Sequence, residues 1–154
     1  MISHLAAVLL LTLAFLAAGI DSYAATLVVT KTADTSDGIC DTDCSLREAV
    51  SAAASGDTIV FSSLFGQPQT LTLKNGQILI AHGLTITGPG RMLLTISGNN
   101  ASRIFFVRSS SAVSLSDMTI MRGSTQIPED SNGGAVYVNR SGLLLRNVTL
   151  TGNT

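Results

Sequence analysis

Hydrophobic and polar residues alternate along most of the chain after residue 56, in short segments that are each followed by Gly, Asn, Ser or Pro. This two-residue period, with many β-branched residues, is typical of strands. Such closely spaced strands leave no room for crossover helices, which excludes a doubly wound α/β fold and predicts an all-β one. The expected strands are Thr26 to Thr32, Asp57 to Phe61, Gln69 to Leu73, Gln77 to Ile80, Leu84 to Thr87, Leu93 to Ser97, Arg103 to Val107, Val113 to Ser116, Met118 to Met121, Ala135 to Asn139, Leu143 to Arg146 and Val148 to Thr151.

The stretch from Cys40 to Ala54 departs from this pattern and predicts a short helix. Ser45 can cap its start, and Glu48, three residues on, can return a bond to the Ser45 amide, which is the capping-box pattern. Gly56 is expected to end the helix in a left-handed conformation. Arg47 points away from the apolar face, so we expect it in solvent or paired with an acid of the preceding loop. The apolar face consists of Leu46, Ala49, Val50 and Ala53.

Internal repeats indicate which kind of all-β fold forms. LTITGPG at Leu84, LTISGNN at Leu94 and VTLTGNT at Val148 are close copies. The segment from Ser111 to Ser124 matches that from Ser141 to Thr154 at an offset of 30 residues, and IFFV at position 104 matches AVYV at position 135 at an offset of 31. Three strands per repeat, with insertions confined to turns, predict a parallel β-helix whose coils stack at ~4.8 Å.

A stack of coils leaves an open core at each end, which invites aggregation unless it is covered. The predicted helix lies just before the first coil, so its apolar face is expected to cover the open core at that end. We therefore predict a cap over residues 25–61 and β-helix coils over 62–154.

The first residues indicate export. Leu5 to Ala18 form an apolar run without charge, followed by Ser22-Tyr23-Ala24 with small residues where signal peptidase cuts. We predict a signal peptide at 1–24, cleaved after Ala24, and a secreted or cell-surface protein with no membrane span after cleavage. The alternative is an uncleaved anchor, although the run is shorter than the ~20 residues that a spanning helix needs.

Cys40 and Cys44 are the two cysteines of the chain. In an oxidising compartment we expect a local disulfide that fixes the start of the helix. A metal site would need two more ligands, and His82, the one His after the predicted cleavage point, is distant in sequence.

Charge is spread unevenly although the net charge is only −1, so no nucleic-acid partner is implied. Six acids face two bases between Ala25 and Val60, and three acids face seven bases from Phe61 onward. Calcium is the one cofactor considered, because the polar loop from Ala33 to Asp43, which we call the cap loop, carries several acids around Gly38 that could supply oxygens. Their spacing departs from the EF-hand loop, so solvated loop acids are the simpler interpretation. These acids are Asp34, Asp37, Asp41 and Asp43.

The cap motif resembles a known family. CSLREA from Cys44 to Ala49, preceded by TADTSDGIC and followed by an alanine run and GDTIVF, is similar to the start of CSLREA-domain proteins. The resemblance covers about residue 27 to the end. It implies a right-handed parallel β-helix exported by bacteria, mostly as part of large surface or secreted proteins. It supplies no catalytic residues, and because the last repeat stops midway we expect a fragment of a longer protein.

Two functions remain open at this stage. The first is the non-catalytic start of a cell-surface or adhesin-like protein that presents a long side to glycans or to other cell-surface proteins. The second is the N-terminal portion of a polysaccharide lyase or glycoside hydrolase of β-helix fold. Catalysis would have to use few groups, so we expect no catalytic residue. The candidates are Asp117 with Arg91 or Arg146, Glu129, Asp130 and His82, which is expected on the surface.

Overall fold

A computed structural model describes residues 23–109, 112–125 and 132–154. They form a parallel β-solenoid of about four turns with one short helix. The predicted β-helix with a capping helix is thereby confirmed as a fold class. Most of the predicted signal peptide, together with Glu129 and Asp130, lies outside the described residues. The elements are β1 (Thr26–Val29), α1 (Leu46–Ala52), β2 (Thr58–Phe61), a 3₁₀ turn (Ser63–Gly66), β3 (Gln69–Thr72), β4 (Ile78–Ile80), β5 (Thr85–Thr87), β6 (Leu94–Ser97), β7 (Phe105–Val107), β8 (Val113–Met121), β9 (Val136–Val138) and β10 (Leu143–Thr151).

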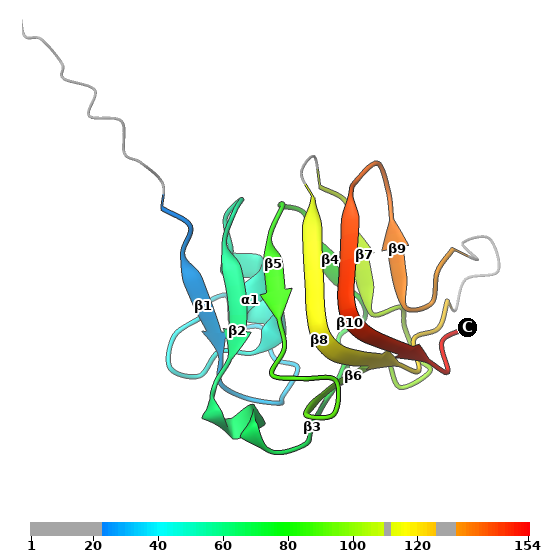
Figure 1. The fold of residues 1–154 in the computed structure, drawn as a ribbon, viewed down its shortest axis with the longest axis horizontal. Coiled ribbons are helices and arrows are strands. Elements are labelled where there is room, and N and C mark those ends of the chain that lie inside the picture. Colours follow the sequence, from blue (N-terminus) through cyan, green and yellow to red (C-terminus); the bar gives the residue numbers. More distant parts are fainter. Residues whose placement is uncertain (1–22, 110–111, 126–131) are drawn as a thin grey trace, which may run out of the picture.

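Three faces run along the solenoid (Figure 1). The first face holds β1, β2, β5 and the starts of β8 and β10, which stand side by side. The second holds β3, β6 and the ends of β8 and β10. The third holds β4, β7 and β9 and lies behind the first. All pairs between these strands are parallel, as stacked coils require.

Two corners differ from the sequence prediction. The strands expected at Val113 to Ser116 and at Met118 to Met121 form the single strand β8, and the last two predicted strands form the single strand β10. Asp117 with φ 58° and Asn147 with φ 49° turn each strand from the first face to the second. One residue in the left-handed region bends the chain while the ladder continues on both sides, so no loop is needed.

The register confirms the repeat offsets. Leu115 lies beside Leu145 and Thr119 beside Thr149, 30 residues apart, and Phe105 lies beside Val136. The copies at positions 84 and 94 do not stack on each other, because they belong to β5 and β6 of one turn.

The core consists of inward columns, one residue from each turn. On the first face Ile59, Ile86 and Leu115 are completely buried, whereas Leu145 in the last described turn is 38% exposed. The second face shows the same change from the buried Ile120 to Leu150, which is 50% exposed. The core is therefore closed at the helical end and open at the end formed by β10.

Helix α1 covers the core at the N-terminal end, as the amphipathic pattern predicts. Leu46, Ala49 and Val50 are buried, and the helix packs against β1 and β4. Gly56 adopts the predicted left-handed conformation, with φ 95°, but it does not end the helix, because the helix ends at Ala52 and Ala53 follows it in an extended conformation. Asp57 accepts the amide hydrogen of Ala54 at 2.7 Å, which diverts the chain before another helical turn forms. In the described part of the chain no helix is long and apolar enough to cross a membrane.

Candidate binding face and its cap

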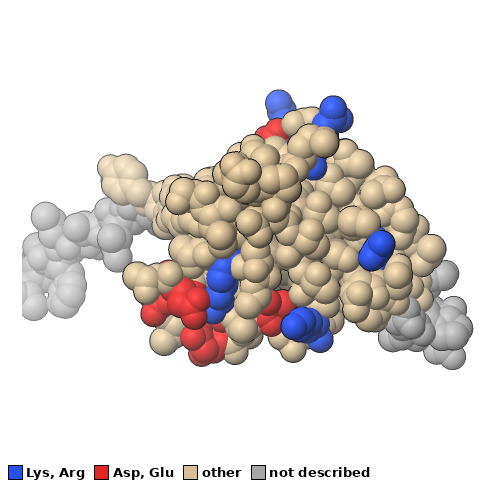
Figure 2. Space-filling view, turned by 90° about the horizontal axis from the view of Figure 1, so that it is seen from below, with Lys and Arg blue, Asp and Glu red and all other residues tan. Residues whose placement is uncertain are grey.

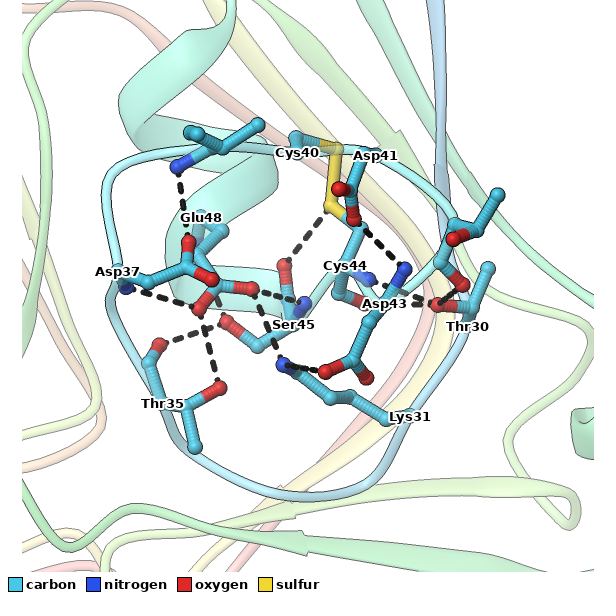
Figure 3. Close-up of a disulfide and its surroundings, with 12 residues drawn as sticks. Thr30, Lys31, Thr35, Asp37, Cys40, Asp41, Asp43, Cys44, Ser45 and Glu48 are labelled. Atoms are coloured by element: carbon cyan, nitrogen blue, oxygen red, sulfur yellow. Dashed lines mark hydrogen bonds and ion pairs between the residues drawn. A yellow bond between two sulfur atoms is a disulfide. The ribbon is translucent and has the colours of Figure 1, made fainter.

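The predicted disulfide joins Cys40 and Cys44 at the start of the helix (Figure 3). Cys44 is completely buried, and its amide donates to the hydroxyl oxygen of Thr30 at 2.8 Å. The Thr30 amide donates back to the Cys44 carbonyl at 2.8 Å. The disulfide therefore holds a loop that is also bonded to the end of β1.

Ser45 and Glu48 form the capping box that the motif predicts. The Ser45 hydroxyl oxygen accepts from the Glu48 amide at 3.1 Å, and a Glu48 carboxylate oxygen accepts from the Ser45 amide at 2.7 Å. Glu48 does more than cap the helix, because its carboxylate also accepts from the Thr35 hydroxyl and the Asp37 amide (Figure 3). Lys31 lies 3.4 Å from it.

These bonds control the charge of Glu48, whose side chain is buried. Burial alone would raise its pKa, but the hydrogen bonds from Ser45, Asp37 and Thr35 outweigh burial and lower the pKa to about 2. Burial would lower the pKa of Lys31, but the hydrogen bond that Lys31 donates to Asp43 and the nearby carboxylates raise this pKa above its usual value. Glu48 is thus a charged centre around which the cap loop is wrapped.

Arg47 pairs with an acid of the preceding loop, as expected, but its side chain is largely buried, whereas we expected a position outside the core. Its guanidinium binds both carboxylate oxygens of Asp34, at 2.7 and 3.0 Å, and donates to the carbonyls of Gly76 and Gln77. Asp34 also accepts from the amides of Lys74 and Asn75. Burial would raise the pKa of Asp34, but the bonds from Arg47 and these amides hold the pKa below its usual range. The pair fastens the cap loop to the first coil.

The acids considered for calcium have separate structural roles. Asp34 binds Arg47, and Asp43 lies 3.1 Å from Lys31. Asp37 and Asp41 each accept a backbone amide two residues ahead, at 2.9 Å. Acidic side chains gather at the end of the molecule that carries the cap (Figure 2). Within the described residues, however, no three His, Cys, Asp or Glu side chains come together as a metal site.

Of the groups considered for catalysis, Asp117 and Arg91 meet at one corner without being paired there, because the Asp117 carbonyl accepts from the Gly90 amide and the Arg91 carbonyl accepts from the Thr119 hydroxyl. Asp117 accepts a 2.7 Å bond from Asn147, and the described structure has no ion pair between Asp117 and Arg91 or Arg146. His82 is exposed, as expected, and borders a hollow of about 350 Å³ between α1 and the first coil.

The third face carries a feature that sequence analysis missed. Leu79, Phe106 and Tyr137 are outward residues of β4, β7 and β9 in direct register, so they form one column along the solenoid axis. Leu79 is 51% exposed, and both aromatic rings are half-buried. The two rings stack with centroids 5.2 Å apart and planes 10° apart. We call these three residues the outer column.

Arg103 fixes the outer column in place. Its guanidinium lies 4.9 Å from the centre of the Tyr137 ring, in cation–π contact. It donates to the Gln77 side chain, just before β4, and to the carbonyls of Asn132 and Gly133, before β9. These residues belong to the turns on either side of its own. The arginine thus connects three turns of the solenoid and contacts the Tyr137 ring of the outer column.

Two hollows open on the same face, one near each end of the outer column. The hollow beside α1 is lined by Leu79, Gln77, Ser51 and His82. The second, of about 300 Å³, is formed by Arg108, Ser109, Asn139 and Arg140, which follow β7 and β9. Polar groups therefore lie beside Leu79 at the start of the outer column and beside Phe106 and Tyr137, past the ends of their strands.

These features define a β-solenoid with a disulfide-bonded helical cap and a column of three outward apolar residues on its third face. In comparisons with known proteins, no family model, no curated protein and no solved structure matches the chain. The resemblance of Cys44 to Ala49 to CSLREA-domain proteins stays a prediction.

Proposed function

We propose that the protein is exported and, without catalysing a reaction, binds a linear glycan along the outer side of its third face, as part of a cell-surface or adhesin-like protein. The outer column carries this proposal. A sugar ring has an apolar C–H face and polar edges, and the column offers Leu79, Phe106 and Tyr137 with polar hollows beside it.

The geometry of the outer column supports an extended ligand. Successive residues are about 4.8 Å apart along the axis, so the column is longer than one sugar ring and continuous from turn to turn. The stacked Phe106 and Tyr137 rings are held by each other and by Arg103. Binding therefore orders few side chains and loses little entropy.

Export is supported by the apolar leader and by the disulfide between Cys40 and Cys44, because disulfides persist mainly in oxidising compartments. Processing after Ala24 is tested by sequencing the N-terminus of protein secreted from a bacterial host; a retained leader contradicts it.

The binding test is affinity electrophoresis of the purified protein through gels that contain single polysaccharides, both neutral and acidic. Tyr137→Ala and Leu79→Ala should each weaken retention by roughly 5- to 10-fold, as loss of an aromatic or apolar contact would. Leu144→Ala is the matched control, because Leu144 is an exposed leucine on an outer surface away from the third face. Melting curves of each variant exclude misfolding.

Retention by no polysaccharide, or equal effects of Leu79→Ala and Leu144→Ala, would reject the proposal. The alternative of a carbohydrate-active enzyme is examined in the same samples. Unsaturated or shortened products after incubation would favour that alternative over a non-catalytic protein.

A further inference from the structure

The hollow near the C-terminal end of the outer column is a positively charged corner. Arg108 lies two residues beyond Phe106, and Arg140 lies three beyond Tyr137 in the next turn. Both arginines are exposed, and together with Ser109 and Asn139 they surround the hollow of about 300 Å³. We call this group the arginine corner.

The arginine corner is held by bonds between the two turns. The Ser141 hydroxyl donates to the Ser109 carbonyl at 2.6 Å, and its oxygen accepts from the Ser109 amide at 2.6 Å. Arg140 has a φ of 55°, a left-handed conformation that is costly for a residue with a Cβ atom. The local fold thus maintains an unfavourable backbone that places a second arginine beside the first.

Within the described residues no acidic group neutralises the charge of the corner. Neither the Arg108 nor the Arg140 guanidinium bonds to another described residue. The described segments 77–82, 103–109 and 132–140, which build the third face, contain no Asp or Glu. A planar guanidinium presents paired N–H donors that match the oxygens of an anion such as a carboxylate, and two of them in one hollow favour an anionic group.

We propose that the arginine corner binds the oxyanion of an acidic glycan, a uronate carboxylate or a sulfate ester, while neighbouring sugar rings lie on the outer column. This inference rests on the proposed function and adds a class of ligand to it. The affinity of acidic glycans should accordingly exceed that of neutral ones with the same ring size.

The experiment is isothermal titration of the full protein with three oligosaccharide probes: oligogalacturonate, which is carboxylated, a sulfated galactan and a neutral galactan. The variant is the double substitution Arg108→Gln and Arg140→Gln. The matched control is Arg91→Gln with Arg122→Gln, which removes two exposed arginines outside the third face and changes the net charge equally. Arg122 has a positive φ, as Arg140 does, so the control variant also replaces an arginine in the left-handed conformation.

We expect acidic probes to bind more tightly than the neutral galactan. The corner variant should lose roughly 10-fold in affinity for them, as expected for charge-assisted bonds, and little for the neutral galactan. The probe that loses more identifies carboxylate or sulfate as the preferred oxyanion. Equal binding of neutral and acidic probes, or equal losses in corner and control variants, would overturn the inference while leaving glycan binding in place. If no probe binds, both the proposed function and this inference are overturned. If Tyr137→Ala still weakens binding while the corner variant does not differ from its control, only this inference fails.

Discussion

The amide of Ala25 donates a 2.7 Å hydrogen bond to a carboxylate oxygen of Asp57, which is buried. The other carboxylate oxygen accepts from the Ala54 amide. Asp57 therefore links the residue before β1 to the turn after α1. Ala25 is also the residue that the predicted cleavage after Ala24 would make the N-terminus.

Cleavage at that bond should stabilise the fold. It would replace the neutral Ala25 amide by an α-ammonium group beside Asp57, and a charge-assisted bond is roughly twice as strong as a neutral one. We expect protein that starts at Ala25 to be more stable than protein that starts at Tyr23 by about 1 kcal/mol, measured by urea unfolding.

The pH dependence of this difference has a definite sign. An ion pair raises the pKa of an amine, so the gain is present below about pH 8, the ordinary value of an α-amino group, and is lost as the pH rises beyond it. Asp57→Asn is the control, in which the two chain starts should become equally stable. A difference that survives in that variant would show that Asp57 is not its source.

Replacing Glu48 should destabilise the cap more than replacing its exposed neighbour. Glu48→Gln keeps the size of the side chain but sets an amide N–H₂ among hydrogen-bond donors, so we expect a loss of about 2 kcal/mol. Asp43→Asn also removes a partner of Lys31, but this carboxylate is exposed and should cost less than about 1 kcal/mol. Equal losses in urea unfolding would contradict the central role of Glu48.

Acid should act through the same residue. The pKa of Glu48 is lowered to about 2, below the 4.5 that is usual for this group. Its contribution to stability is therefore complete above pH 4.5 and is lost as the pH falls towards 2. The melting temperature of the parent protein should fall over this range more steeply than that of Glu48→Gln.

Arg47 should not tolerate replacement by lysine. Lys keeps the charge but cannot bind both oxygens of Asp34 and two carbonyls together. We expect Arg47→Lys to lose about 2 kcal/mol in urea unfolding, because the buried Asp34 carboxylate would keep an incomplete set of partners. Arg122→Lys, at an exposed position, should change stability by less than about 0.5 kcal/mol. A well-behaved Arg47→Lys protein would show that the ion pair does not hold the cap.

The fold could be predicted because equivalent residues recur in the sequence at intervals of about one coil. Leu115 and Leu145 lie 30 residues apart in sequence and side by side in space, since stacked coils bury equivalent positions on each other. The corners at Asp117 and Asn147 could not be predicted, because a single left-handed residue leaves the same alternating pattern as a loop between two strands. Gly56 does not cap the helix because the Asp57 side chain binds the Ala54 amide, so the helix ends earlier.

The binding face was hidden for a different reason. In the run from Ile104 to Val107 every residue is apolar, so the pattern does not show which of Phe105 and Phe106 faces outward. A shift of one residue reverses the faces of a strand, and the complete burial of Phe105, together with the register of Phe106 with Leu79 and Tyr137, identifies Phe106 as the outward one. The sequence does hold a signal for the outer column. Aligned repeats carry large apolar residues at the same strand position, namely Leu79, Phe106 and Tyr137.

Replacing a core leucine by alanine should reduce the free energy of unfolding by an amount that depends on where the leucine lies along the solenoid. Leu115→Ala removes a buried side chain from the middle of an inward column and should cost about 3 kcal/mol. Leu145 occupies the same column one turn later but is 38% exposed, so Leu145→Ala should cost less than about 1 kcal/mol. If α1 covers the core as a cap, Leu46→Ala should resemble Leu115→Ala, and Leu46→Asp should abolish cooperative melting. The measurement is urea unfolding of all four variants, and a Leu46→Ala protein as stable as Leu145→Ala would contradict the capping role of the helix.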